Sequence, residues 1–152
     1  MVADVLGILG PLRIILGGNR YTLDYLPILL GRRVIDIYAV LHQIKVSRAE
    51  TCYQMIDALQ KTPPGGTPLI VMELLNSFYD ENLSNEEVTG VLNSCVAALI
   101  RLSKTTPIII TADPDERRPE LIDLLYKLAD AVVEMVPNTE PKKDLQPNLF
   151  GA

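Results

Sequence analysis

Short apolar runs alternate with longer stretches of helical periodicity along this chain of 152 residues. Five of the runs are continuous rather than alternating, and glycine, proline or polar residues bound them. Continuous apolar runs are typical of strands that are buried on both faces of a parallel sheet. We expect strands at residues 12–16, 44–46, 68–72, 107–111 and 131–136.

Helical periodicity fills the intervals between these runs. The clearest case begins after Ser84, which forms an S-x-x-E capping box with Glu87 and precedes one apolar stripe. We expect helices at residues 21–30, 35–43, 49–60, 85–104 and 119–128.

The alternation of strands and helices predicts an α/β fold, with a mostly parallel sheet of about five strands and helices on both of its faces. A hydrophobic content of 48% in a chain of this length fits a single core. We assign residues 1–136 to one domain. Residues 137–152 are rich in proline and polar side chains and predict a flexible tail.

Composition narrows the range of partners. The formal net charge of −5 disfavours a broad, sequence-independent grip on phosphates, so any contact with DNA must be local. The two cysteines, Cys52 and Cys95, lie in apolar periodic stretches and are expected in the core. The first ten residues have neither a basic leader nor the length of a membrane span. We therefore expect a cytoplasmic protein without a membrane partner.

Three segments resemble the RecA/RadA recombinase superfamily in order and spacing. Residues 14–21 (IILGGNRY) are similar to the strand and turn after its phosphate-binding unit, and residues 46–54 (VSRAETCYQ) to the segment that opens the next helix. Residues 68–79 (PLIVMELLNSFY) resemble the Walker B strand and its extension, and residues 107–111 match the strand that follows. The resemblance extends over about residues 12–136 and implies a RecA-like core of the P-loop NTPase fold.

The departures from this family concern its chemistry. The sequence contains no G-x-x-x-x-G-K-[ST] loop, which would supply the phosphate cradle, the lysine and the Mg²⁺-binding hydroxyl. Glu73 stands at the Walker B aspartate position, and Gly18 at the position of the glutamate that activates water. Only residues 1–11 precede the first strand, so we expect the strand leading into the loop to be absent. The resemblance thus implies a degenerate ATPase with no catalytic residues and no cofactor.

The resemblance implies an accessory or adaptor protein in DNA recombination, repair or replication, which acts through protein partners and has DNA as a further candidate partner. A core without one central strand leaves open strand edges, so we expect a homodimer or a heteromer. In RecA-like proteins the loop after residues 107–111 contacts DNA, which makes Arg117 and Arg118 candidate DNA ligands. The acidic residues beside them weaken this assignment, and a solvated loop is the alternative.

The end of the chain carries a second resemblance. Gln146, Leu149 and Phe150, in the sequence QPNLF, resemble the Q-x-x-L-F pentapeptide with which bacterial polymerases and repair proteins bind the sliding clamp. Glutamine is a two-way hydrogen-bonding group, and the two apolar side chains can fill a pocket. The alternative is that Leu149 and Phe150 pack against the protein's own surface.

Other readings remain open. Glu73 and Asp113 end neighbouring predicted strands, where α/β proteins place ligands, and together they would offer oxygen ligands to Mg²⁺ or Ca²⁺ in a metal-binding or hydrolytic enzyme. Against this, acidic residues also favour helix N-termini and solvated loops. The chain would otherwise be the C-terminal fragment of a longer ATPase, or a partner would supply its missing strand.

Overall fold

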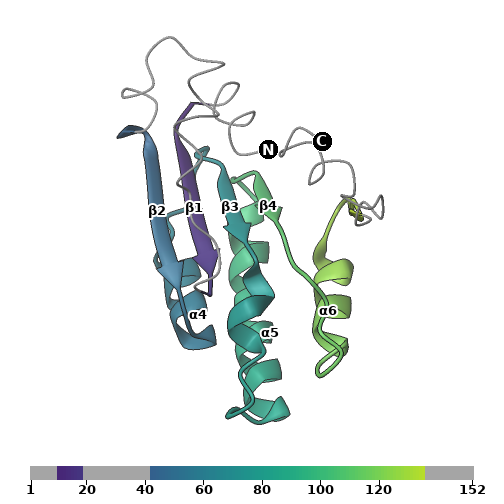
Figure 1. Cartoon of the computed structure of the whole chain (residues 1–152). Helices are drawn as coiled ribbons and strands as arrows, with labels where there is room; N and C mark the ends of the chain where they lie inside the picture. Colours follow the sequence, from purple (N-terminus) through teal and green to yellow (C-terminus); the bar gives the residue numbers. More distant parts are fainter. Residues whose placement is uncertain (1–9, 19–41, 136–152) are drawn as a thin grey trace, which may run out of the picture.

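The computed structural model describes residues 10–18 and 42–135, which form one four-stranded parallel sheet with helices against it (Figure 1). The strands are β1 (Leu12–Gly17), β2 (Ile44–Ala49), β3 (Leu69–Met72) and β4 (Ile108–Ile110). The helices are α4 (Cys52–Lys61), the 3₁₀ helix η1 (Leu74–Phe78), α5 (Asn85–Ser103) and α6 (Glu120–Leu128). The α/β class and the parallel sheet predicted from the sequence are confirmed.

The strands lie in the order β2-β1-β3-β4. β1 is therefore internal and pairs in parallel with β2 on one side and with β3 on the other. The chain moves outward from β1 to β2 and then crosses back to β3, so the direction of winding reverses between β1 and β3. Ligands of open α/β sheets commonly bind at the carboxyl ends of the strands that flank such a reversal.

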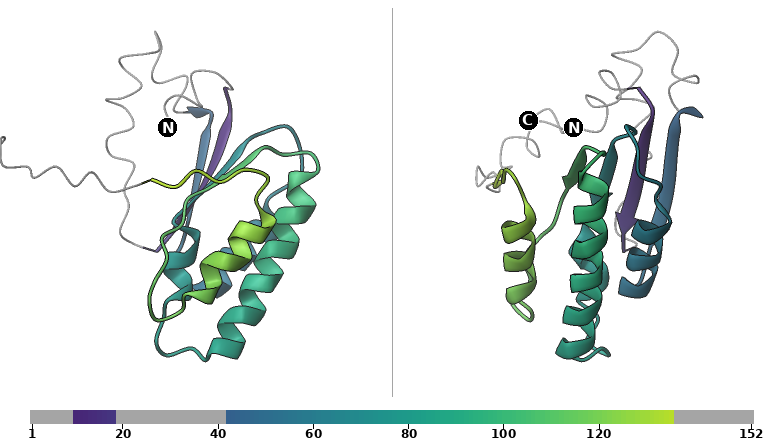
Figure 2. Two further views of the ribbon diagram at one scale, coloured as in Figure 1. Left: turned by 90° about the vertical axis from the view of Figure 1, so that its right-hand side faces the viewer. Right: turned by 180° about the vertical axis from the view of Figure 1, so that it is seen from behind.

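Side-chain capping boxes mark the first residues of α4 and α5. Ser84 and Glu87 form the predicted capping box of α5, and Thr51 and Gln54 form a second box at the start of α4. α4 and α5 pack against each other and lie behind the sheet in the view of Figure 1, where α6 stands to the right of β4; Figure 2 shows the same elements from the side and from behind. Cys52 and Cys95 are completely buried between these elements, as predicted.

The hydrophobic core lies between the helices and the sheet. Ile15, Leu69 and Val71 point into it from the strands, and Phe78 is its largest completely buried side chain. Leu12, Ile14 and Ile70 are also buried but lie outside this cluster, so both faces of the two internal strands are withdrawn from water.

Within the described residues the sheet has four strands, instead of the predicted number of about five. Residues 131–135 form no strand, and Val133 and Met135 are each 85% exposed. The second strand runs to Ala49 rather than ending at residue 46, because its pairing with β1 continues to Gly17. α4 accordingly begins at Cys52 instead of residue 49.

The described residues place helices on one face of the sheet only. The predicted helix at residues 21–30, and all but the last two residues of the one at 35–43, lie outside the described residues. The prediction of helices on both faces of the sheet is therefore tested only for the face on which the described helices lie. Within residues 10–18 and 42–135, no helix combines the length and the apolar character needed to cross a membrane.

Candidate functional site

Glu73 stands at the end of β3 in an unusual backbone conformation. Its φ and ψ angles of 52° and 53° make it the only non-glycine residue with positive φ in the described part of the chain. Residues other than glycine rarely adopt this left-handed conformation, which costs about 1 kcal/mol or more. The turn it creates converts β3 into η1 and directs the chain across the carboxyl edge of the sheet.

Thr111 holds this conformation from the neighbouring strand. Its hydroxyl accepts a hydrogen bond from the Glu73 main-chain N–H at 2.8 Å and donates one to Glu73 Oε1 at 3.1 Å. The main-chain N–H of Leu74 donates to the Thr111 carbonyl at 3.1 Å. These contacts join the end of β3 to the end of β4.

The Glu73 carboxyl group is enclosed and incompletely bonded. The residue is 8% exposed, and Oε2 is buried without a hydrogen-bond partner among the described residues. Leaving a buried polar atom unpaired costs about 1–3 kcal/mol. Burial raises the pKa of Glu73, the neighbouring Asp113 carboxyl raises it further, and the hydrogen bond from Thr111 opposes the shift. The structure thus brings together Glu73 and Asp113, the two predicted metal ligands.

The end of β1 packs directly on the end of β3. A Cβ atom at Gly17 would lie 2.1 Å from the Glu73 carbonyl oxygen, so no larger residue fits without movement of the backbone. Gly18 has a φ of +73°, and a Cβ atom there would meet the Asn76 side chain at 3.2 Å. These glycines allow the closest approach of the two strands at the reversal of the winding.

A polar cavity of about 410 Å³ opens at this edge, and we call it the carboxyl-edge pocket. Tyr79 forms part of its wall: its hydroxyl donates to the Asp113 main-chain oxygen at 2.6 Å. Burial, with the charges of Asp115, Asp113 and Glu73, raises the pKa of Tyr79 to about 12, so it remains a neutral donor at physiological pH. The pocket lining includes Gly18, Glu50, Asn76, Tyr79, Asp80 and Asp113.

The two candidate DNA ligands differ in environment. Arg118 is 7% exposed, and its guanidinium donates to the main-chain oxygens of Phe78 and Leu83 at 2.6 Å each. Its charged group is thus committed to holding η1 and the following loop. This placement leaves it no direct route to a phosphate.

Arg117, by contrast, lies at the surface and lines the carboxyl-edge pocket. Its guanidinium makes a two-pronged contact with Asp115, at 2.9 and 2.7 Å, and a third contact with Glu81 at 2.6 Å. The hydrogen bonds from Arg117 lower the pKa of Asp115 to about 2. A phosphate would have to compete with two carboxylates for this side chain.

The remaining predicted site residues, Gln146, Leu149 and Phe150, lie outside the described residues. Thr111 and Tyr79 were not singled out as functional in the sequence. One feature of the sequence could have indicated Thr111: it is a hydroxyl residue at the end of an apolar run, and such a side chain can reach the end of the neighbouring strand. No feature of the sequence could have indicated the positive φ angle of Glu73.

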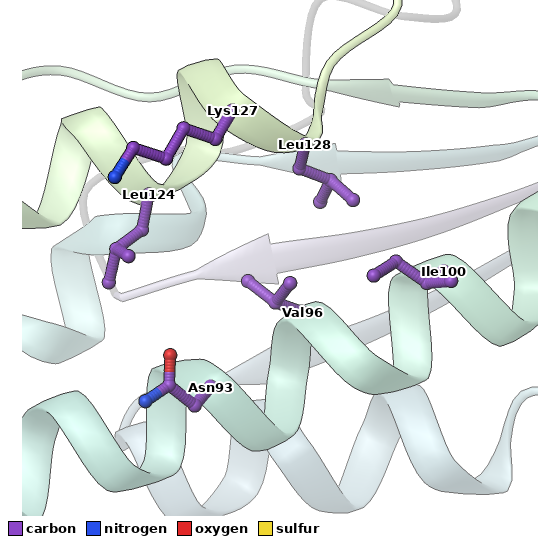
Figure 3. A pocket seen from close by; sticks show the side chains of 6 residues that line it. All are labelled: Asn93, Val96, Ile100, Leu124, Lys127 and Leu128. Carbon is purple, nitrogen blue, oxygen red and sulfur yellow. The ribbon is translucent and has the colours of Figure 1, made fainter.

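A second cavity, of about 400 Å³, lies between α5 and α6. Figure 3 shows Val96 and Ile100 of α5 and Leu124 and Leu128 of α6 pointing toward the gap between the two helices, with Asn93 and Lys127 at its margin. Four of its six lining residues are apolar, whereas most residues of the carboxyl-edge pocket are polar or charged, so the carboxyl-edge pocket is the better candidate for a ligand site.

The comparisons with family models and with curated proteins identify no relative. No protein-family model matches the chain, and a search of curated proteins finds no match. The likeness to the RecA/RadA superfamily therefore rests on the short sequence segments alone.

Proposed function

We propose that this protein is a non-catalytic, RecA-like accessory protein of DNA recombination, repair or replication, which acts through protein partners. The placement of the resembling segments supports this proposal. Residues 14–21 contribute to β1, residues 46–54 to β2 and residues 68–79 to β3. These three strands lie side by side in the sheet. The three segments that resemble one family core thus belong to three adjacent strands of one sheet, with β1 between the other two.

The observation that carries the non-catalytic part of the proposal is the environment of Glu73. A Walker B carboxylate must be ionised and open toward a metal and a nucleotide phosphate. Glu73 is enclosed, its Oε1 is engaged by Thr111, and burial raises its pKa. Together with the missing phosphate loop in the sequence, this arrangement favours a fold that has lost its nucleotide chemistry.

The partner-binding part of the proposal draws on the edges of the sheet and on the tail. β2 and β4 are the two edge strands among the described elements, and each carries an exposed apolar residue: Val46 at 50% and Ile109 at 38%. Open edges of this kind favour association with a second strand. The QPNLF sequence at residues 146–150 adds a candidate clamp-binding segment.

The metal-dependent alternative has one supporting observation, the proximity of Glu73 and Asp113. However, residues 10–18 and 42–135 contain no group of three or more His, Cys, Asp or Glu side chains arranged to hold a metal ion. Mg²⁺ and Ca²⁺ require about six or more oxygen ligands, so two carboxylates are a poor site without substrate or water ligands. The accessory role is the function we retain.

Titration of the whole protein against the sliding clamp of its source organism tests the proposal. We expect a micromolar dissociation constant, because a short segment must be ordered on binding. Replacement of Gln146, Leu149 and Phe150 together by alanine should abolish the signal, whereas Asn148→Ala, at a variable position of the motif, should preserve it. Equal binding by the wild type and the triple variant, or no binding by either, would refute clamp recruitment.

A further inference from the structure

Residues 131–135 (AVVEM) form an exposed apolar segment after α6, which we call the post-α6 segment. Val133 and Met135 are each 85% exposed, and Val132 is 49% exposed. A spacing of two residues places Val133 and Met135 on one face of an extended chain. The segment has the apolar, valine-rich composition of a strand, yet it pairs with no strand among the described residues. Covering it would remove apolar surface from water.

β4 offers an edge that such a segment can cover. It is the last strand in the order β2-β1-β3-β4, so its outer edge has no strand partner in the described part of the chain. Ile108 and Ile110 pack against the core, whereas Ile109 between them is 38% exposed. An open edge presents unpaired main-chain N–H and C=O groups, which favour the addition of another strand.

The post-α6 segment lies on the same side of the molecule as this edge but does not use it. Figure 1 shows the chain leaving α6 beyond β4, on the side away from β3, and the view from behind in Figure 2 agrees. The hydroxyl of Tyr126 donates to Glu134 Oε1 at 2.9 Å, which ties the segment to α6 instead. The segment and the β4 edge are therefore both available to another molecule.

A second copy of the chain supplies the matching surface for each of them. Around a two-fold axis, the segment of one copy meets β4 of its partner, and the same contact is repeated in the opposite direction. Main-chain hydrogen bonds would hold the added strand, as in other complexes formed by strand addition. One chain thus carries both halves of the contact.

We propose that two copies of this chain associate by pairing residues 131–135 of each copy with the outer edge of β4 of the other. The proposal rests on the partner-binding role of the sheet edges proposed above and names a second copy as the partner. The five residues of the segment and the three of β4 are far fewer than the roughly 20–30 residues a side of a standard interface. The dimer is therefore weak, with a dissociation constant of about 10–100 µM.

Sedimentation velocity of the full chain, from about 1 µM to about 1 mM, tests this association. We expect a monomer at the low end and a dimer at the high end. Val133→Lys and Ile109→Lys should each raise the dissociation constant at least tenfold, because a lysine on a pairing edge opposes strand addition. Val46→Lys is the matched control: it makes the same replacement on β2, the other edge strand, and should dimerise as the wild type does.

Cross-linking separates pairing between copies from pairing within one copy, and it does not require the lysine variants to fold. Ile109→Cys and Val133→Cys are prepared as separate proteins, and a bismaleimide is added to each alone and to their mixture at high concentration. The native cysteines are completely buried, so the introduced thiols react first. The mixture should give more covalent dimer than either variant alone.

Three results would overturn the proposal. The first is a wild type that stays monomeric throughout the concentration range. The second is a dimer that Val46→Lys dissociates and Val133→Lys does not, which would place the interface on β2. The third is a mixture that cross-links no better than the separate variants. A monomer that still binds the sliding clamp would overturn the dimer and leave the accessory role standing, so the two failures are distinguishable.

Discussion

The Thr111 hydroxyl bonds to both ends of Glu73: it accepts from the main-chain N–H at 2.8 Å and donates to Oε1 at 3.1 Å. One side chain therefore fixes both the left-handed backbone of Glu73 and the direction of its carboxyl group. Thr111→Val keeps the shape of the side chain but removes both bonds and leaves a buried N–H unpaired. We expect a loss of about 1–3 kcal/mol in the free energy of unfolding.

Urea denaturation measures this loss, and Thr111→Ser is the matched control because it retains the hydroxyl. The serine variant should lose less stability than the valine variant. The reverse order would show that the methyl group, rather than the hydrogen bonds, is what stabilises this junction.

Glu73 should make stability depend on pH. Burial and the Asp113 carboxyl raise its pKa above the ordinary value of 4.5, while the Thr111 hydroxyl opposes them. The folded state then binds the proton more tightly than the unfolded state, so this contribution is fully present at low pH and is lost as the pH rises through the folded pKa. Glu73→Gln should remove that loss, so its free energy of unfolding at pH 8, measured by urea denaturation, should be higher than that of the wild type.

The difference between Glu73→Gln and the wild type should shrink toward pH 4, where both side chains are neutral. Glu116→Gln, an exposed replacement that also removes one negative charge, should show no such convergence. If the free energies of unfolding of the wild type and Glu73→Gln differed by the same amount at every pH, the buried acid would be ruled out as the source of the pH dependence.

Two glycine replacements should change stability in opposite directions. Gly17→Ala places a methyl group 2.1 Å from the Glu73 carbonyl oxygen, which forces β1 and β3 apart at their ends. We expect a loss of about 3 kcal/mol or more. Gly90→Ala, in the interior of α5 with open space around it, should gain about 0.5–1 kcal/mol from helix propensity. Thermal unfolding of the two variants, followed by circular dichroism, compares them directly.

The adjacent arginines should differ in their effect on stability. Arg118→Met leaves the buried carbonyls of Phe78 and Leu83 without their charged donor, which should cost about 2–4 kcal/mol. Arg117→Met breaks solvent-exposed ion pairs and should cost less than about 1 kcal/mol. Similar losses in urea denaturation would mean that the burial of Arg118 contributes nothing to the fold.

Nucleotide binding should be absent. The sequence lacks the phosphate loop, and Glu73 is enclosed at the end of β3. Calorimetry with ATP and Mg²⁺ at micromolar concentrations should give no binding heat, and phosphate release should not exceed background. A clear ATP signal that disappears in Glu73→Gln would restore the ATPase reading.

The strands that sequence reasoning found are those whose residues are apolar on both faces. β1 and β3 are continuous apolar runs, and their burial follows from that pattern alone. The predicted strand at residues 131–136 has a similar apolar character, but its described part, residues 131–135, has no paired neighbour among the described residues, and a strand depends on its partner more than on its own propensity. The length of β2 likewise follows from its register with β1, which no local pattern contains.

The candidate site was predictable only where it depends on strand ends. Glu73 and Asp113 follow neighbouring parallel strands, so their proximity could be expected from the order of elements. The burial of Arg118 could not, because its carbonyl partners lie 35 and 40 residues earlier in the chain. The positive φ of Glu73 depends on contacts with Thr111 and Gly17, both of which are tertiary.

The internal position of β1 also has a consequence for synthesis on the ribosome. β1 is made first among the four strands, yet its partner β3 is complete only at Met72, 55 residues after Gly17. At a translation rate of about 5–20 residues per second, this apolar strand waits roughly 3–11 s for its second neighbour. During that interval its unpaired apolar edge is exposed, so we expect the nascent chain, rather than the finished protein, to be the form that chaperones bind and that aggregates.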